Sequence, residues 1–257
     1  MPANDLALLI RAARTAGQIA ARFWQQAPRS WEKPGSQGPV TEADIAIDAM
    51  LHEMLSGARP DYGWLSEESR DAPARLSARR IFIVDPIDGT RAFMKGERAF
   101  AHSLAVVEDG VPHAAVVFLP MLGRLYAGAR DAGATLNGTR IRATGRAALD
   151  GAAILIASSA LRPQFWAGPV PRIDAHLRPS LAYRMCLVAE GRFDAMITIR
   201  DSWHWDSAAG ALIVGEAGGV VSDRGGAPLK FNTASAVSAG LVAAPPALHA
   251  KILRRLA

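Results

Sequence analysis

A short apolar segment that ends in two aspartates constrains the fold of this 257-residue chain more than any other feature. Residues 81–84 are apolar and mostly β-branched, which predicts a buried strand. The strand runs into the sequence Asp-Pro-Ile-Asp-Gly-Thr at residues 85–90. Pro86 fixes its own φ and favours extended geometry at Asp85, while Gly89 allows a tight turn. We therefore expect the end of this strand to bring two carboxylates, three residues apart, to one point.

The oxygen atoms of this turn suit a hard cation. Asp85 and Asp88 supply carboxylates, and the Ile87 carbonyl lies between them, which gives the all-oxygen ligand set that Mg²⁺ prefers. Gly89 and Thr90 are expected to open a helical turn whose free N–H groups bind a phosphate group. The alternative is an ordinary turn without a ligand, because Asp, Pro and Gly are common turn residues.

Two further acidic positions would complete such a site, and each also has a structural interpretation. Glu67 and Glu68 follow a predicted strand at residues 63–66, where adjacent glutamates could equally lie on the solvated surface. Asp206 opens a predicted helix over residues 206–217, where a carboxylate is a common N-cap. One oxygen of Asp206 can cap the helix while the other binds a metal, so the two interpretations are compatible.

Apolar periodicity predicts the other elements. Thr41 and Asp44 have the spacing of a capping box, so a helix is expected to begin there. Helices are also predicted over residues 5–25, 181–190, 206–217 and 246–256, and strands over residues 63–66, 81–84, 103–107, 114–118, 125–129, 153–157, 195–199 and 237–243. Residues 26–39, rich in Pro, Gly and Ser, predict a loop. Strands dominate the first half and alternate with helices in the second, which favours two subdomains, 1–140 and 141–257.

The bulk properties narrow the class of protein. No apolar run reaches the ~18 residues that a membrane span needs, and Arg11 and Arg14 interrupt the hydrophobic residues near the N-terminus. Cys186 is the only cysteine, which excludes an intrachain disulfide. The net charge of +5 comes from basic residues spread along the chain, without the basic block of a nucleic-acid-binding protein. We expect a cytoplasmic protein that binds no membrane and no nucleic-acid polymer. The net charge is compatible with a small anionic substrate, although a general preference for arginine is the favoured explanation of it.

Four segments in order carry a resemblance to a known family. They are Pro-Val-Thr-Glu-Ala-Asp at residues 39–44, Leu-Ser-Glu-Glu-Ser at 65–69, Val-Asp-Pro-Ile-Asp-Gly-Thr at 84–90, and Trp-Asp-Ser-Ala-Ala at 205–209, with Glu-Ala-Gly-Gly following at 216–219. Together they resemble the inositol monophosphatase family. The resemblance implies a five-layer αβαβα sandwich, a homodimer, two or three Mg²⁺ ions per active site, and inhibition by Li⁺.

The resemblance also implies the metal ligands. Glu67, Asp85 and the Ile87 carbonyl are expected to hold the first metal. Asp85, Asp88 and Asp206 are expected to hold the second.

Catalytic and substrate-binding roles follow from the same resemblance. Thr90, hydrogen-bonded to Asp44, is expected to orient the attacking water at the metal that Glu67 holds, so these three residues are the predicted catalytic groups. The amides of Gly89 and Thr90 are expected to bind the phosphate. Lys33 lies in the segment that covers the site in relatives, which implies a role in substrate binding or in weaker metal binding.

The substrate is less constrained, because family members divide among inositol phosphates, 3'-phosphoadenosine 5'-phosphate, sugar bisphosphates and histidinol phosphate. Residues 181–191 look like the matching helix of bacterial 3'(2'),5'-bisphosphate nucleotidases, which carry a basic residue where Arg184 stands. A guanidinium there can bind a second phosphate, although a salt bridge is its alternative role. Inositol-specific relatives place a glutamate where this chain has Thr198 or Ile199. We therefore favour 3'-phosphoadenosine 5'-phosphate over inositol 1-phosphate, with sugar and histidinol phosphates as further alternatives.

Two rival interpretations are weaker. Aspartyl phosphatases use an Asp-x-Asp-Gly-Thr sequence with a covalent nucleophile, whereas Asp85 and Asp88 are three residues apart. A catalytically inactive metal- or nucleotide-binding protein is disfavoured, because every acid of the predicted site is present. For His204, beside Asp206, a structural role is favoured over contact with substrate.

Overall fold

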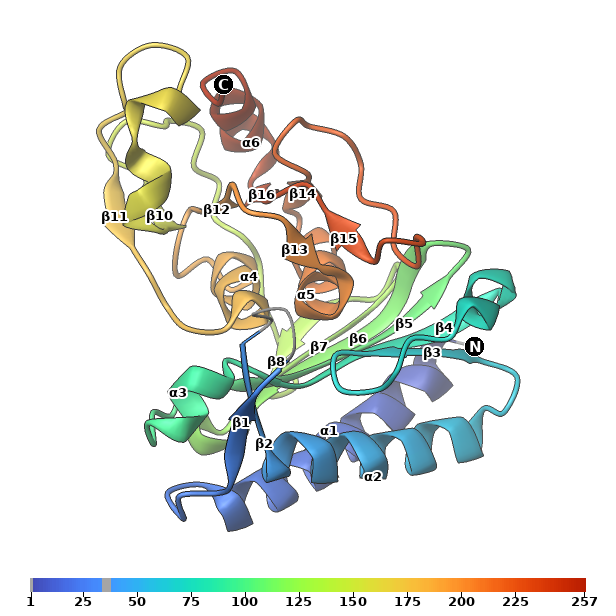
Figure 1. Cartoon of the computed structure of the whole chain (residues 1–257). Coiled ribbons are helices and arrows are strands. Elements are labelled where there is room, and N and C mark those ends of the chain that lie inside the picture. Colours follow the sequence, from blue (N-terminus) through green and yellow to red (C-terminus); the bar gives the residue numbers. More distant parts are fainter. Residues whose placement is uncertain (1, 34–37) are drawn as a thin grey trace.

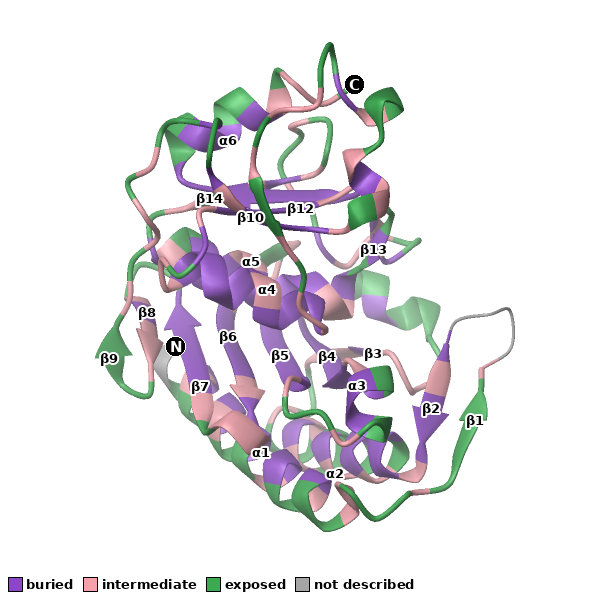
Figure 2. Cartoon of the chain, turned by 90° about the vertical axis from the view of Figure 1, so that its left-hand side faces the viewer, coloured by how far each residue is buried: buried purple, intermediate pink, exposed green. Residues whose placement is uncertain are grey.

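The computed structural model describes residues 2–33 and 38–257, and its helices and sheets form five layers (Figure 1). The helices are α1 (Pro2–Phe23), α2 (Glu42–Ala58), α3 (Thr90–Met94), α4 (Leu181–Ala189), α5 (His204–Glu216) and α6 (Pro246–Leu253). Short 3₁₀ turns are η2 (Pro73–Ser77), η3 (Pro120–Leu122), η4 (Ser158–Leu161) and η5 (Pro163–Phe165). Helices α1 and α2 cover one face of a large sheet, α4 and α5 lie between that sheet and a second one, and α6 covers the outer face of the second (Figures 1 and 2). The predicted αβαβα sandwich is confirmed.

The larger sheet has seven strands in sequence order. They are β3 (Gly63–Ser66), β4 (Arg80–Asp88), β5 (Ala101–Glu108), β6 (Val111–Leu119), β7 (Arg124–Ala129), β8 (Gly133–Leu136) and β9 (Thr139–Arg140). All neighbours are antiparallel except β3 and β4, which are parallel. The predicted strands of this sheet are confirmed, and tight turns at residues 109–110 and 137–138 connect β5 to β6 and β8 to β9.

The second sheet has five strands in the order β11-β10-β12-β16-β14. They are β10 (Ala153–Ile156), β11 (Asp174–His176), β12 (Ala195–Thr198), β14 (Val220–Ser222) and β16 (Leu241–Ala244). Two small antiparallel ribbons complete the fold: β1 (Ser30–Glu32) with β2 (Pro39–Thr41), and β13 (Ser202–Trp203) with β15 (Val237–Ser238).

Three predicted elements differ from the structure. The loop expected over residues 26–39 contains β1, and residues 34–37 lie outside the described part of the chain. The strand expected over 237–243 is divided into β15 and β16, because Gly240 adopts a φ of 67° and turns the chain between them. The last helix ends at Leu253, earlier than expected.

Strand alternation fills the core on both faces of the larger sheet. Along β5, Leu104 and Val106 pack in the cluster beneath α1 and α2, whereas Ala105 and Val107 pack in the cluster that α4 and α5 cover. That second cluster joins residues from both sides of position 140. A boundary near residue 140 between two subdomains stays a prediction.

Within the described ranges, no helix combines the length and the apolar character needed to cross a membrane.

Helix α5 carries Asp206 and is placed by close packing against α4. A Cβ atom added at Gly210 would lie 2.8 Å from the Met185 Cβ and 2.7 Å from its Sδ. The absence of a side chain at Gly210 therefore allows the two helices to approach each other. Gly215, near the other end of α5, is exposed and meets nothing within 4 Å.

These two glycines should respond in opposite directions to the same substitution. We expect Gly210→Ala to lower the free energy of unfolding by about 1–3 kcal/mol, because it overpacks the α4–α5 contact. Gly215→Ala should raise it by up to about 1 kcal/mol, because alanine is the better helix former and has room there. Urea unfolding of both variants measures the difference. Equal effects would contradict the close approach of α4 and α5.

Candidate active site

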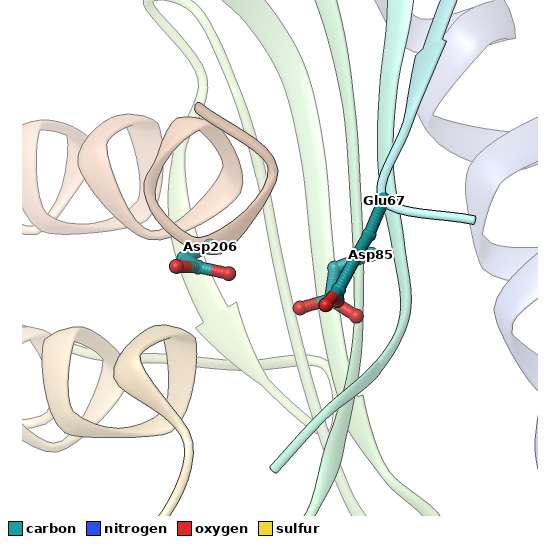
Figure 3. A group of neighbouring side chains, drawn as sticks. All are labelled: Glu67, Asp85 and Asp206. Carbon is teal, nitrogen blue, oxygen red and sulfur yellow. The ribbon is translucent and has the colours of Figure 1, made fainter. Parts of the chain in front are cut away.

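The parallel pairing of β3 and β4 places two of the predicted ligands side by side. Ser66 pairs with Val84, so Glu67 and Asp85 follow at the same edge of the sheet. Asp206 approaches this edge from the first turn of α5, in the next layer (Figure 3). Each of the three acids offers an oxygen, and these oxygens lie within 4.8 Å of one another.

A cleft of about 260 Å³ opens at this edge. Its lining includes all five predicted metal ligands, together with Gly89, Thr90 and Ser180. The predicted ligands and the predicted phosphate-binding turn therefore share one cavity.

Burial and the repulsion between like charges raise the pKa values of acids in the cluster. Burial raises the pKa of Asp85 well above its usual range, and the charges of Glu67, Asp88 and Asp206 raise it further. The pKa of Asp206 is also raised well above its usual range, by burial first and then by the charges of Asp88 and Glu67. The buried Asp85 Oδ1 has no hydrogen-bond partner among the described residues. Carboxylate oxygens that converge in this way fit a hard divalent cation, which would relieve both the repulsion and the missing partner.

Asp88 has a second role that the sequence did not reveal. Its carboxylate accepts hydrogen bonds from the Ser180 hydroxyl at 2.7 Å and from the backbone N–H groups of Leu181 at 3.2 Å and Ala182 at 2.7 Å. Asp88 therefore caps the N-terminus of α4 from a distant part of the chain. Because each carboxylate oxygen has two lone pairs, these bonds leave room for a metal. Binding of the second metal by Asp88 stays a prediction.

The predicted pair of Thr90 and Asp44 is brought together. The Thr90 hydroxyl lies 3.4 Å from Asp44 Oδ1 and 3.1 Å from the Ile87 carbonyl oxygen. The other Asp44 oxygen accepts bonds from the backbone N–H and the hydroxyl of Thr41, which confirms the capping box at the start of α2. Burial raises the pKa of Asp44 to about 6, against the lowering effect of the Thr41 bonds.

The predicted phosphate-binding turn also has its expected conformation. Thr90 begins α3, and Gly89 caps that helix with a φ of 102°. A side chain would be strained at this φ, so glycine is required for the turn.

Lys33 lies beside the cluster as an ion-pair partner. Its Nζ donates to Glu67 at 2.7 Å and to Glu68 at 2.6 Å. Burial lowers the pKa of Lys33, but the two glutamates outweigh burial and the net pKa is raised. Burial raises the pKa of Glu68 to about 7 despite this contact. Lys33 thus neutralises part of the acidic charge, and its role toward substrate or metal stays a prediction.

Arg184 lies on α4, close enough to Asp88 and Asp206 for their charges to raise its pKa. Burial has the larger, opposite effect, and the net pKa of Arg184 is lowered from a very high value. Its Nε lies 3.4 Å from the Ser180 carbonyl oxygen. The guanidinium is therefore part of the site's electrostatics.

Two histidines near the site are buried. His204 packs edge-on against Phe231, with ring centroids 5.1 Å apart, and burial lowers its pKa to about 4. His102 is fully buried on β5, and burial lowers its pKa to about 4, while its bond to Pro86 opposes the shift. Sequence reasoning passed over His102 and Ser180. The available signals were a histidine within an apolar strand pattern and a serine directly before a predicted helix.

Comparisons with known proteins agree with this geometry. The inositol monophosphatase family profile matches residues 2–257. The inositol-1-monophosphatase of Rhizobium meliloti is 35% identical over 240 residues, which cover 88% of each chain. The Nus factor SuhB of Escherichia coli is 34% identical over 229 residues, covering 85% of this chain and 84% of that protein. The solved Thermotoga maritima IMPase superimposes with a TM-score of 0.83 at 28% identity, over 99% of this chain and 96% of the other.

The fold and the acidic site define a metal-dependent phosphatase. The chain belongs to the inositol monophosphatase family, whose members depend on Mg²⁺.

The raised pKa values predict that the stability of the metal-free protein falls as pH rises, which is unusual for a cluster of acids. Folded Asp85 and Asp206 keep protons that the unfolded chain has already lost above about pH 4. The stability of the metal-free protein should therefore fall as pH rises from about 4 through the folded pKa values, which reach about 6 for Asp44 and about 7 for Glu68. Mg²⁺ should restore stability at neutral pH, because its ligands must be deprotonated.

Thermal unfolding in EDTA and in excess Mg²⁺ checks this prediction. We expect Mg²⁺ to raise Tm more at about pH 8 than at about pH 5. Asp206→Asn should reduce the rise in Tm that Mg²⁺ produces at the higher pH. An increment independent of pH in the unmodified protein would argue against metal binding by these carboxylates.

Proposed function

We propose that this chain hydrolyses a small soluble phosphate monoester with Mg²⁺ held by Glu67, Asp85 and Asp206, with Asp88 and the Ile87 carbonyl completing the ligand sets. The observation that carries the proposal is the convergence of three carboxylates around a buried oxygen that lacks a partner. Bound Mg²⁺ supplies a Lewis acid that neutralises charge on the phosphoryl oxygens.

The chain's own residues would then position the reactants. At neutral pH Asp44 is mostly ionised, because its pKa is about 6, so it can accept the Thr90 hydroxyl proton in a hydrogen bond. This leaves a lone pair on the Thr90 oxygen to accept a bond from the attacking water. The amides of Gly89 and Thr90, at the turn into α3, would hold the phosphate. The catalysis proposed here is mainly positioning and charge neutralisation.

Phosphate release tests this function directly. Asp206→Asn should lower kcat/KM at least about 100-fold, because the amide supplies no charge to the cation. Asp150→Asn is the matched control, since Asp150 is exposed and its carboxylate pairs with the exposed Arg172. Mg²⁺-dependent turnover that survives Asp206→Asn would refute the assigned site. Binding of Mg²⁺ without turnover of any phosphate monoester would instead indicate a binding protein.

For the substrate, we propose a molecule with a second phosphate, of which 3'-phosphoadenosine 5'-phosphate is the first candidate. The supporting observation is that the Arg184 guanidinium lies close enough to Asp88 and Asp206 for their charges to raise its pKa. A guanidinium is the side chain best suited to bind a phosphate group. Inositol 1-phosphate is the second candidate, and the name of the Rhizobium meliloti relative favours it.

Substitution of Arg184 separates the two candidates. Arg184→Met should lower kcat/KM for 3'-phosphoadenosine 5'-phosphate at least about 10-fold, because it removes a charge-assisted contact. It should change turnover of inositol 1-phosphate much less. Arg11→Met, on the exposed surface of α1, serves as the control. An equal loss with both substrates would remove Arg184 from substrate selection, and a preference of the unmodified protein for inositol 1-phosphate would reverse the order of the candidates.

We also propose, from family membership, that the protein is a cytoplasmic homodimer and that Li⁺ inhibits it. Sedimentation velocity and phosphate release in LiCl test these two properties.

A further inference from the structure

His102 lies opposite an irregularity in the strand that carries the metal ligands. Asp85 pairs with Ser103 and Asp88 pairs with Ala101, so the register shifts between these two pairs. Two residues of β4 therefore face one residue of β5, which is His102. This is the pattern of a β-bulge, which leaves part of the strand ladder unpaired.

The His102 side chain supplies a partner to the bulge. Its Nδ1 lies 2.5 Å from the Pro86 carbonyl oxygen. A carbonyl oxygen can only accept, so Nδ1 must carry the proton and donate it. Pro86 itself has no N–H group to pair with β5. The imidazole thus replaces a ladder hydrogen bond that the bulge removes.

His102 acts from the face of the sheet opposite the acidic cluster. Leu104 on β5 and Phe100, directly before β5, belong to the cluster that packs beneath α1 and α2. The His102 ring also lies against Phe118, with centroids 6.2 Å apart. On β4, Phe82 and Val84 belong to the same cluster, so alternation directs the Asp85 side chain to the other face. His102 is therefore not itself a metal ligand.

The peptide that His102 holds lies between two predicted ligands. The Pro86 carbonyl follows Asp85 and precedes the Ile87 carbonyl, which the Thr90 hydroxyl contacts at 3.1 Å. The carbonyl oxygens of two successive residues of the bulge thus lie within hydrogen-bond distance of side chains: His102 Nδ1 for Pro86 and the Thr90 hydroxyl for Ile87. A displacement of the chain at Pro86 would move the two groups that flank its carbonyl, which are Asp85 and the Ile87 carbonyl.

We infer that His102 is a positioning residue for the metal site, holding the bulge of β4 in the conformation that presents the ligand oxygens. This inference rests on the proposed function, because it assumes that these oxygens bind a divalent cation. It assigns a role in metal affinity to a residue that contacts neither metal nor substrate.

Three substitutions of His102 distinguish the hydrogen bond from packing. His102→Asn places an amide N–H where Nδ1 lies and keeps the donor. His102→Gln carries its amide farther out, where Nε2 lies, and His102→Leu has no donor. Phe118→Leu is the control for packing, because it alters the contact with the ring and leaves the hydrogen bond.

Mn²⁺ binding, measured by the electron paramagnetic resonance of free Mn²⁺ without substrate, is the main measurement. We expect His102→Gln and His102→Leu to weaken Mn²⁺ binding about 10-fold or more, the usual range for residues that orient ligands. His102→Asn and Phe118→Leu should stay close to the unmodified protein. In phosphate-release assays, His102→Gln and His102→Leu should require a higher concentration of Mg²⁺ for activity. The KM for substrate at saturating Mg²⁺ should change little.

The outcomes separate this inference from the proposed function. If the unmodified protein does not bind Mn²⁺, the proposed function fails. If it binds Mn²⁺ and the Gln and Asn variants bind it equally well, the role of His102 is overturned. If circular dichroism shows that His102→Leu does not fold, the comparison of His102→Gln with His102→Asn still tests the hydrogen bond, because both side chains are polar and close in size. If Phe118→Leu weakens binding as much as His102→Gln, packing rather than the hydrogen bond controls the site.

Discussion

Mutual repulsion among three clustered carboxylates, of which Asp85 is buried, is the constraint on which the rest of this structure depends. Asp85 is 1% exposed, and Glu67 and Asp206 each bring an oxygen within 4.8 Å of it and of each other. Flexible segments would separate such charges, so the three acids need elements that cannot easily move apart. Parallel strands β3 and β4 fix two of them at one sheet edge, and α5 brings the third from the next layer. The close contact of Gly210 with Met185 shows how tightly that layer is packed. The scaffold therefore holds three carboxylates close together, and a bound cation can offset the electrostatic cost of their repulsion.

The backbone between the ligands is held as firmly as the side chains. Asp88 is bonded to three groups at the start of α4, so the ligand turn of β4 and the N-terminus of α4 fix each other's position. The Thr90 hydroxyl lies 3.1 Å from the Ile87 carbonyl oxygen, and His102 Nδ1 donates to the Pro86 carbonyl from the face of the sheet opposite the acidic cluster. Ligand geometry at a metal site depends on such supporting bonds, because a ligand oxygen is only as well placed as the atoms that carry it.

Sequence patterns predicted the parts of this arrangement that are encoded locally. A few consecutive residues are enough to recognise each of these parts: the β-branched run before Asp85, the capping box at Thr41, and the apolar runs of β5, β6 and β7. The short strands β8, β9, β11, β13 and β14 were not predicted, since two to four residues carry too little periodicity. The contacts of Asp88 with Ser180, 92 residues away, and of Lys33 with Glu67, 34 residues away, depend on tertiary structure. The resemblance to a family supplied the ligand set, which local patterns alone left open.

Substrate choice is the property that this site encodes least, and the reason is physical. The acidic cluster and the turn at Gly89 recognise a phosphate group, which every candidate substrate carries. Discrimination must come from groups that reach beyond it, and Arg184 is the charged group that α4 brings closest to Asp88 and Asp206. Under the proposed function, a cation bound by those aspartates takes over the neutralisation that Arg184 supplies without metal. The proposed preference for a second phosphate over the neutral hydroxyls of inositol therefore rests on the charge of this one guanidinium.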